Sequence, residues 1–420
     1  MRVVVFILAF LVCAGQGHRV QKASNTTRNS GRREAAHRLR ALASLLVAAR
    51  DSSAAWHSSV QTLAGHHHSG RALAGGPTRP ARAWLSPAMV TEVEEEDVAV
   101  KLRAEDTRHR PLYDWLESGG AELGPIYLDK SKFDGFGGFA SRDIEEGEVI
   151  FVIPTKACVN TYDACGDADI GKLLANLTMK GQGGATVSLA ISIAKEWLCE
   201  NNTGPRGPFL DLLPWGRGGD QEQEHVVWWT WDQMKDLEGS SEALRDAWFV
   251  REEVQNAVMV GRAVLKDVIR DNYKKRGKNV IEVFNAEKDI ANAMRGAFVT
   301  ILSRSFADTI SNDELETRLI PLLDMIQHDK EDNIIYENVV DEETGENFVQ
   351  VSAFRPIKKG QEFFLDYNFD LSDSKFLSRF GFIPDTTIPA YVEKLKGNRS
   401  LMTKIMINWP RPSLPGIQNP

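Results

Sequence analysis

Apolar and polar positions along the chain predict two regions of short strands separated by a long helical block. Between Ile126 and Val159, short apolar runs are broken by Gly and Asp, a pattern typical of strands and turns. From about Leu173 to Phe306, apolar residues recur at helical spacing, most clearly in 252–273 and 290–302. Strand patterns return at 334–340, 348–354 and 362–366. This order predicts an α+β fold in which a β-rich domain is interrupted by a helical insertion at about residues 165–300.

The first 91 residues differ from the rest of the chain in composition. Val3–Cys13 form a short apolar run after Met1-Arg2, and the small residues Ala14-Gly15 follow, as in a secretory signal peptide. Residues 16–91 are rich in Arg, Ser and Ala and almost free of acids, which is typical of organellar transit peptides. We therefore expect delivery through the secretory pathway to a plastid. The alternative is a secreted protein with a disordered basic tail.

The remaining chain is expected to divide into three parts. Glu92–Asp97 is an acidic run that predicts a linker, and Leu112–Ser118 is expected to form a short amphipathic helix. Residues 92–122 would thus be a linker and an N-terminal helix. The main domain is expected at 123–384, and a short C-terminal tail is expected at 385–420.

Charge and cysteine content narrow the classes of partner. Residues 1–91 carry 12 Lys and Arg against two acids, a net charge of +10, and because the whole chain carries −8, the remainder carries −18. An acidic body repels phosphate backbones, which disfavours nucleic acid and favours a basic protein partner. After residue 91 the cysteines are Cys158, Cys165 and Cys199, without a C-x-x-C pair, so no metal site is expected.

Three segments contain residues suited to a reaction site. Gly135–Ala140 is a glycine-rich turn, and glycine lets the backbone approach a ligand closely. A strand pattern follows it, not the helix that a dinucleotide fingerprint requires. Leu319–His328 is an apolar run that ends in a Gln-His pair, and Gly360–Tyr367 is an apolar run that ends in a tyrosine. In this order and at these distances, the segments resemble those of a SET-domain protein methyltransferase, whose fold consists of small sheets with a knot-like C-terminal crossing.

The resemblance implies roles for individual residues. Because the family holds S-adenosylmethionine with the glycine turn, an arginine and an Asn-His pair, it implies cofactor binding by Asp134, Gly135, Phe136, Arg304, Gln327 and His328. Ser303-Arg304-Ser305-Phe306 resembles a segment of the Rubisco large-subunit lysine methyltransferase branch, whose arginine contacts the cofactor carboxylate. Tyr367 matches the catalytic tyrosine. Substrate binding is implied for Asp324, Tyr367 and Phe380.

A few positions near the implied site depart from the family pattern. Gln327 stands where the family usually has Asn, and it offers the same amide on a longer arm. Asp373 stands for the usual Asn and Phe380 for the usual Tyr, whereas Asn333 matches the family's asparagine beyond the histidine. The missing hydroxyl at Phe380 removes a hydrogen-bond partner near the acceptor amine, which favours more highly methylated products.

Two further features concern the same branch. Gly207–Pro214 and the stretch from Trp228 to Ser241 resemble its helical insertion, and Trp228, Trp229 and Trp231 are expected in the insertion core. Only 36 residues follow Pro384, too few for the helical C-terminal substrate domain of the branch. This departure argues against Rubisco itself as the substrate.

The resemblance as a whole implies an enzyme. The expected activity is S-adenosylmethionine-dependent lysine N-methylation of a plastid protein, by a monomer that needs no metal and has no membrane contact after processing. Two alternatives stay open. One is a protein-histidine methyltransferase, and the other is a non-catalytic module that keeps the SET fold and binds peptides.

Overall fold

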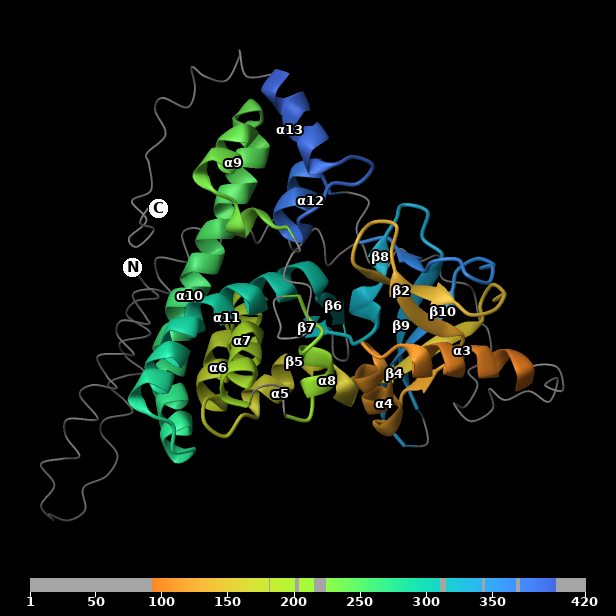
Figure 1. The fold of residues 1–420 in the computed structure, drawn as a ribbon, viewed down its shortest axis with the longest axis horizontal. Coiled ribbons are helices and arrows are strands. Elements are labelled where there is room, and N and C mark those ends of the chain that lie inside the picture. The colour runs from red at the N-terminus through yellow and green to blue at the C-terminus, as the bar shows by residue number, and fades with distance from the viewer. Residues whose placement is uncertain are drawn as a thin grey trace, which may run out of the picture. The chain divides into compact units, whose positions relative to one another are not determined.

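The computed structural model describes residues 93–180, 182–200, 204–214, 224–309, 315–341, 344–367 and 371–397. All described residues belong to one compact unit, whose fold is drawn in Figure 1. The presequence expected at 1–91 and the last part of the expected tail, 398–420, lie outside the described residues.

In the part of the chain that the structure describes, two helices precede the first strand, one more than the sequence predicts for this region. α3 (Val93–Glu105) begins within the acidic run that was expected to be a linker, and α4 (Arg110–Ser118) is the expected short helix. Acidic residues in the first turn of a helix interact favourably with the positive end of the helix dipole, so an acidic sequence is compatible with a helix start. Arg103 in α3 donates to the carbonyls of Leu123, Gly124 and Ile126 at 2.9–3.1 Å, which fastens α3 to the first strands.

The strands form four small sheets. The largest has the order β1-β4-β10-β9 with antiparallel pairing, and β2 and β3 form a hairpin. β5, β7 and β6 form a third sheet, and β8 and β11 form a parallel pair. The bounds are β1 (Glu122–Leu123), β2 (Ile126–Lys130), β3 (Phe136–Ala140), β4 (Val149–Pro154), β5 (Val159–Asn160), β6 (Phe306–Thr309), β7 (Leu315–Leu319), β8 (Gln327–His328), β9 (Ile334–Val340), β10 (Asn347–Ala353) and β11 (Phe364–Leu365).

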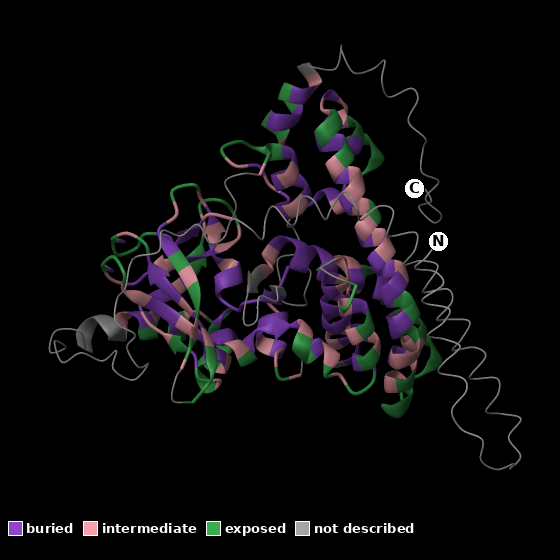
Figure 2. Ribbon diagram, turned by 180° about the vertical axis from the view of Figure 1, so that it is seen from behind, coloured by how far each residue is buried: buried purple, intermediate pink, exposed green. Residues whose placement is uncertain are grey.

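The helical block lies between β5 and β6, as the apolar spacing predicts. Its two long helices pack as a hairpin, and Gly261 of α10 contacts Met294 of α11 so closely that an added Cβ would clash at 2.5 Å. Buried residues line the packed sides of these helices (Figure 2). The helices are α5 (Thr161–Cys165), α6 (Gly171–Thr178), α7 (Gln182–Lys195), α8 (Gly207–Leu210), α9 (Trp231–Lys235), α10 (Ser241–Lys275) and α11 (Val280–Arg304), and a π-helical turn (Glu196–Glu200) follows α7.

The C-terminal helices pack against the start of α10. α12 (Asp373–Phe380) and α13 (Ile388–Gly397) join α9 and α10 around one hydrophobic cluster, in which Tyr391, Val392 and Leu395 of α13 are buried. The first part of the expected tail is therefore a packed helix. No helix among the described residues is long and apolar enough to cross a membrane.

The three tryptophans expected in the insertion core have different environments. Trp229 is 5% exposed and belongs to the hydrophobic cluster, but Trp228 and Trp231 are 42% and 52% exposed. The prediction is thus wrong for two of the three. Thr230 caps α9 through a capping box with Gln233, which makes Trp231 the first helical residue, and this position lies at the surface.

Candidate active site

A crossing of the chain brings the three predicted motifs together. β8 runs parallel to β11, with Gln327 opposite Phe364 and His328 opposite Leu365. Just before β11, Phe363 donates its backbone N–H to the carbonyl of Gly138 in β3 at 2.8 Å. The strand expected at 362–366 is therefore short, with Glu362 forming an isolated bridge to Phe139. The segment that leads to Tyr367 is held between the glycine turn and the Gln-His pair.

Asn333 fixes this crossing from one side. Its side-chain nitrogen donates to the carbonyl of Glu362 at 2.8 Å, and its side-chain oxygen accepts from the backbone N–H of Phe364 at 2.8 Å. Its own backbone N–H donates to the carbonyl of Phe364 at 3.1 Å. Asn333 is 2% exposed, so water cannot replace these bonds. The residue acts as a bracket for the strand that precedes Tyr367.

We expect Asn333→Ala to lower the free energy of unfolding by about 3 kcal/mol, because two buried backbone groups lose their partners. Urea denaturation measures this change. Asn285→Ala, at an exposed helical position, is the matched control and should change stability by less than about 0.5 kcal/mol. Equal stability of the two variants would show that the bracket contributes nothing.

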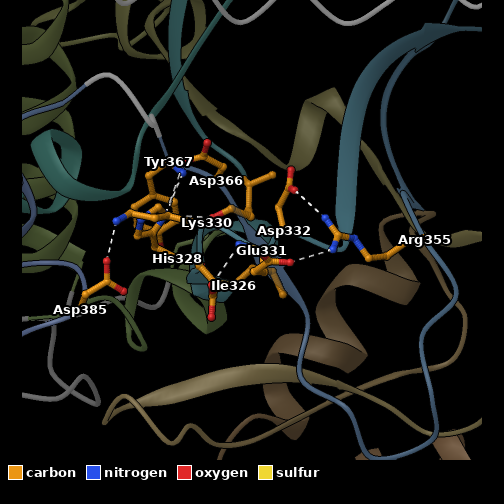
Figure 3. Close-up of polar contacts among 11 residues, drawn as sticks. Ile326, His328, Lys330, Glu331, Asp332, Arg355, Asp366, Tyr367 and Asp385 are labelled. Atoms are coloured by element: carbon orange, nitrogen blue, oxygen red, sulfur yellow. Dashed lines mark hydrogen bonds and ion pairs between the residues drawn. The ribbon is translucent and has the colours of Figure 1, made fainter.

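Tyr367 is anchored at both its backbone and its hydroxyl group (Figure 3). Its O–H donates to the carbonyl of Ile326 at 2.7 Å, and its backbone N–H donates to Nδ1 of His328 at 3.1 Å. Burial raises the pKa of Tyr367 to about 12, and the nearby charge of Asp324 acts in the same direction. The phenol is therefore neutral at physiological pH and acts as a hydrogen-bond group, not as a base.

Aromatic rings enclose Tyr367. The ring centroids of His328 and Phe380 lie 5.2 and 5.1 Å from that of Tyr367, and that of Phe382 lies 6.3 Å away. Phe376 contacts His328 at 5.0 Å and Phe380 at 5.4 Å, which completes the group. These rings come from β8, α12 and the residues after it. They make the surroundings of the Tyr367 ring largely apolar.

His328 is a buried, neutral imidazole. It is 8% exposed, and burial lowers its pKa although Asp366, 3.8 Å from Nδ1, opposes this effect. Nδ1 lies 3.1 Å from the backbone N–H of Tyr367, which can only donate, and 3.3 Å from the carbonyl of Leu365, which can only accept. The ring proton is therefore on Nε2 when Nδ1 accepts from Tyr367, and on Nδ1 when it donates to Leu365. Nε2 is buried and has no hydrogen-bond partner among the described residues, so it is a polar atom that a ligand can use.

Arg304 and Asp324 form a second polar pair near Tyr367. Arg304, the last residue of α11, donates to the backbone carbonyl of Asp324 at 2.8 Å and lies 3.6 Å from its carboxylate. Burial raises the pKa of Asp324 to about 6, and Arg304 limits the rise. Asp324 lies two residues after Leu322, whose φ of 71° is rare for a bulky residue and marks local strain. The carboxylate of Asp324 is thus held in a buried position, where the loss of solvation destabilises its charged form.

Gln327 connects the Gln-His pair to the glycine turn. Its side-chain nitrogen donates to the carbonyls of Phe136 at 2.9 Å and Asp134 at 3.4 Å. Asp134 and Gly135 both have positive φ, 76° and 70°, so the turn needs a residue that tolerates this conformation. With the nitrogen engaged, Oε1 of Gln327 remains as an acceptor.

The segment between α3 and α4 contacts the glycine turn at Phe136. The guanidinium of Arg108 lies 4.4 Å from the centroid of the Phe136 ring, and the imidazole of His109 packs edge-on at 4.6 Å. Asp106 fixes His109 through a 2.7 Å contact to Nδ1. Residues outside the three motifs therefore determine where Phe136 lies.

The structure brings together every site residue predicted from the sequence, through the contacts just described. The predicted residues are Asp134, Gly135, Phe136, Arg304, Asp324, Gln327, His328, Tyr367 and Phe380. The sequence reasoning missed the carbonyl of Ile326, the pair Arg108 and His109, and the ring of Phe376. In the described part of the chain, no group of three or more His, Cys, Asp or Glu side chains is placed to hold a metal ion.

Comparison with known proteins defines the class. The family model of the SET domain matches residues 135–368, more than half of the chain, and the protein therefore belongs to the SET-domain family. This match confirms the predicted family and, with the solved structures below, the predicted α+β fold. No curated protein sequence matches the chain.

Solved structures that resemble the chain include structures of LSMT. The SET domain of LSMT bound to lysine and AdoHcy matches with 19% identity and a TM-score of 0.50, and the form bound to methyllysine and AdoHcy with 20% and 0.51. In both, the match covers 67% of this chain and 58% of the other. Rubisco LSMT bound to sinefungin and monomethyllysine has 20% identity, a TM-score of 0.48, and coverage of 67% and 57%. This chain thus spans less than two thirds of those proteins.

Proposed function

We propose that this protein is an S-adenosylmethionine-dependent protein-lysine N-methyltransferase. The observation that carries the proposal is the placement of Tyr367, whose hydroxyl is bonded to Ile326 and whose backbone is bonded to the histidine of the Gln-His pair. A binding module would need the fold but not a buried tyrosine hydroxyl in this position. Family membership and the lysine-bound LSMT structures support the same activity.

The polar groups at the site fit the methionine part of the cofactor. That part carries a carboxylate and an ammonium group, which need donors and an acceptor respectively. Nε of Arg304 is a buried donor and Nε2 of His328 a buried polar atom, both without partners among the described residues, and Oε1 of Gln327 is an acceptor. A Cβ added at Gly135 would meet one described atom within 4 Å, Nε2 of Gln327 at 3.9 Å, so there is room beside this backbone for a ligand. These residues would hold the cofactor, which supplies an activated methyl group.

The chain's own residues would then align and desolvate the acceptor amine. A free lysine with a pKa of about 10.4 is almost fully protonated at pH 7, and apolar surroundings favour the neutral, nucleophilic form. The rings of Phe376, Phe380 and Phe382 supply such surroundings next to Tyr367. The neutral hydroxyl of Tyr367 and the carbonyl of Ile326 orient the amine. Alignment and fixed dipoles, not covalent catalysis, would supply most of the rate.

Calorimetry and a methyl-transfer assay test the proposal. Protein without residues 1–91 should bind S-adenosylmethionine with no added metal, and transfer of labelled methyl to plastid proteins should yield methyllysine on amino-acid analysis. Labelled methylhistidine would favour the histidine alternative. Cofactor binding without transfer to any protein would favour a non-catalytic module. No binding by folded protein would end the enzyme proposal.

Phe380→Tyr should shift the products toward lower methylation. The ring of Phe380 is 8% exposed and lies beside Tyr367. A hydroxyl added to it would form a hydrogen bond with the acceptor amine, and this bond would hold the methylated amine in an orientation that disfavours a second transfer. We expect the ratio of second to first methylation rates to fall about tenfold, the effect of about 1.4 kcal/mol. Mass spectrometry of a peptide time course measures both rates. An unchanged ratio would mean that Phe380 only fills space.

We also propose that the substrate is a plastid protein and that residues 1–91 direct import. The support is the change from an apolar run to an Arg- and Ser-rich, acid-poor stretch. A fluorescent reporter fused after residue 91 should enter a plastid, whereas one fused after residue 20 should be secreted. Cytosolic or nuclear fluorescence of the longer fusion would contradict plastid import, and secretion of both would favour the secreted alternative.

A further inference from the structure

The turn between α10 and α11 exposes large apolar side chains. Val280, Ile281 and Phe284 are 83%, 71% and 55% exposed, although they open a helix whose opposite side is buried. At 100° per residue, these three side chains and Lys288 fall within an arc of about 100°. Ala286, which is buried, lies on the other side of the helix. The exposed side chains thus form one continuous stripe.

This turn is held firmly in place. Asn279 caps α11 by accepting from the backbone N–H groups of Ile281 and Glu282 at 2.9 and 3.0 Å. Glu282 completes the capping box by accepting from the N–H of Asn279. Behind the turn, Arg270 of α10 binds Glu287 of α11 at 2.8 Å. The exposure of the apolar stripe is therefore a property of a capped, cross-linked helix end.

The tip of the turn beside the stripe is basic on a protein that is otherwise acidic, and the acids Asp271, Glu282, Glu287 and Asp289 flank this tip in the sequence. Residues 272–281 contain four basic residues and no acid, whereas residues 92–420 carry −18 in total. The basic residues are Lys274, Lys275, Arg276 and Lys278, all exposed. Only Lys278 among these four has an ion pair with a described residue, at 2.9 Å to Glu282. Lys288 lies over the Phe284 ring at 4.4 Å, which adds a fifth charge beside the stripe.

The turn lies far from the candidate active site. Arg304 and Val280 are the two ends of α11, and 24 residues of helix span about 36 Å. Figure 1 shows the turn at the end of the hairpin remote from α12 and α13. A contact made by the turn would leave Tyr367 accessible to a substrate.

We propose that the α10–α11 turn docks the protein on an anionic membrane surface. Val280, Ile281 and Phe284 would insert among the lipids, and the surrounding lysines and arginine would contact acidic headgroups. Charge complementarity favours this partner, because negative lipid attracts the turn and repels most of the protein. A protein partner would need a complementary surface of roughly 800 Å² per side, which three side chains at a turn do not offer. The proposal replaces the expectation of no membrane contact and does not depend on the proposed activity.

The test is a vesicle experiment with a local readout. Because residues 1–91 carry +10 and also attract acidic lipid, hydrogen exchange is followed by peptide in the full chain. Vesicles of mixed phosphatidylserine and phosphatidylcholine should slow exchange in 274–288, and vesicles of phosphatidylcholine alone should not. Ile281→Ser with Phe284→Ser should abolish this protection. Val340→Ser, at another apolar position that is 57% exposed, is the matched control and should preserve it.

Charge variants supply the second arm. Lys274→Glu with Lys275→Glu should weaken the protection so that at least about twenty-five-fold more acidic lipid is needed, since each basic residue near such a surface contributes about fivefold and the new glutamates are repelled. Lys101→Glu with Lys172→Glu makes the same change of net charge at exposed positions elsewhere and should have little effect. Unchanged exchange in 274–288 on acidic vesicles would overturn the proposal. Protection that appears without lipid and grows with protein concentration would overturn it in favour of a second copy.

Discussion

Tyr367→Phe is expected to reduce the single-turnover rate about a hundredfold while cofactor affinity stays unchanged. The ring keeps its packing against His328 and Phe380, so only the hydroxyl is lost. The proton of this hydroxyl is donated to Ile326, so its oxygen is the group that would act on the positively charged methyl group. A preorganised dipole in a water-excluded site typically contributes about 3 kcal/mol to the transition state. An interaction made at the transferring methyl group affects the rate and not the binding of the ground state. Single-turnover kinetics and separate cofactor titrations measure the two quantities.

A second tyrosine separates this effect from a loss of stability. The hydroxyl of Tyr273 donates to the carbonyl of Leu198 at 3.1 Å, as that of Tyr367 does to Ile326, but in the helical block. Tyr273→Phe should therefore lose about 1 kcal/mol of stability, as Tyr367→Phe also should, with a normal rate. If both variants kept normal rates, Tyr367 would serve only as a structural residue at the end of the strand.

Motif order and spacing predict most of the site because its residues lie in three short segments. The sequence places Gln327-His328 and Tyr367 each at the end of an apolar run, and the parallel pairing of β8 with β11 then brings them together. The carbonyl of Ile326 is missed because every residue has a carbonyl, and only tertiary pairing selects the one that Tyr367 reaches. The same holds for Arg108, whose contact with Phe136 depends on the packing of the N-terminal helices.

Local patterns also fail where two interpretations have equal support. An acidic run reads equally as a solvated linker or as a first helical turn, and the carbonyls that Arg103 reaches in the first strands favour the helix α3. Trp231 looks like core by composition, but the cap at Thr230 places it at an exposed helix start. The exposure of Trp231 depends on where the helix begins, and the apolar character of the side chain does not predict this.

Arg304→Ala is expected to weaken cofactor binding and to destabilise the protein in a pH-dependent way. Loss of a charge-assisted hydrogen bond should reduce cofactor affinity about thirtyfold. Removal of one partner also leaves the carboxylate of Asp324, 1% exposed, without its compensating charge, which costs about 3 kcal/mol at neutral pH. Isothermal titration and urea denaturation measure the two losses.

The sign of the pH dependence follows from the raised pKa of Asp324. Its pKa rises from the ordinary 3.8 to about 6 on burial, so the folded state holds the proton more tightly than the unfolded state. The stabilisation that protonated Asp324 contributes to the folded state is fully present below pH 4 and is lost as the pH rises through about 6. Without Arg304, which lowers this pKa, the loss should continue to higher pH. Arg304→Ala should therefore be about 3 kcal/mol less stable than the wild type at pH 8 and only about 1 kcal/mol less stable at pH 4, where the hydrogen bond to the carbonyl of Asp324 is still lost.

A double variant isolates the charge as the cause. Asp324→Asn has no carboxylate to titrate, so it should remove the pH dependence of the effect of Arg304→Ala between pH 4 and 8. In this background, Arg304→Ala should cost about 1 kcal/mol, because no buried carboxylate is left unpaired. A destabilisation by Arg304→Ala that is equal at pH 4 and pH 8, or unchanged in the Asp324→Asn background, would show that Arg304 stabilises the protein through its packing. Its effect on the cofactor would then also come from a displaced helix end and not from its charge.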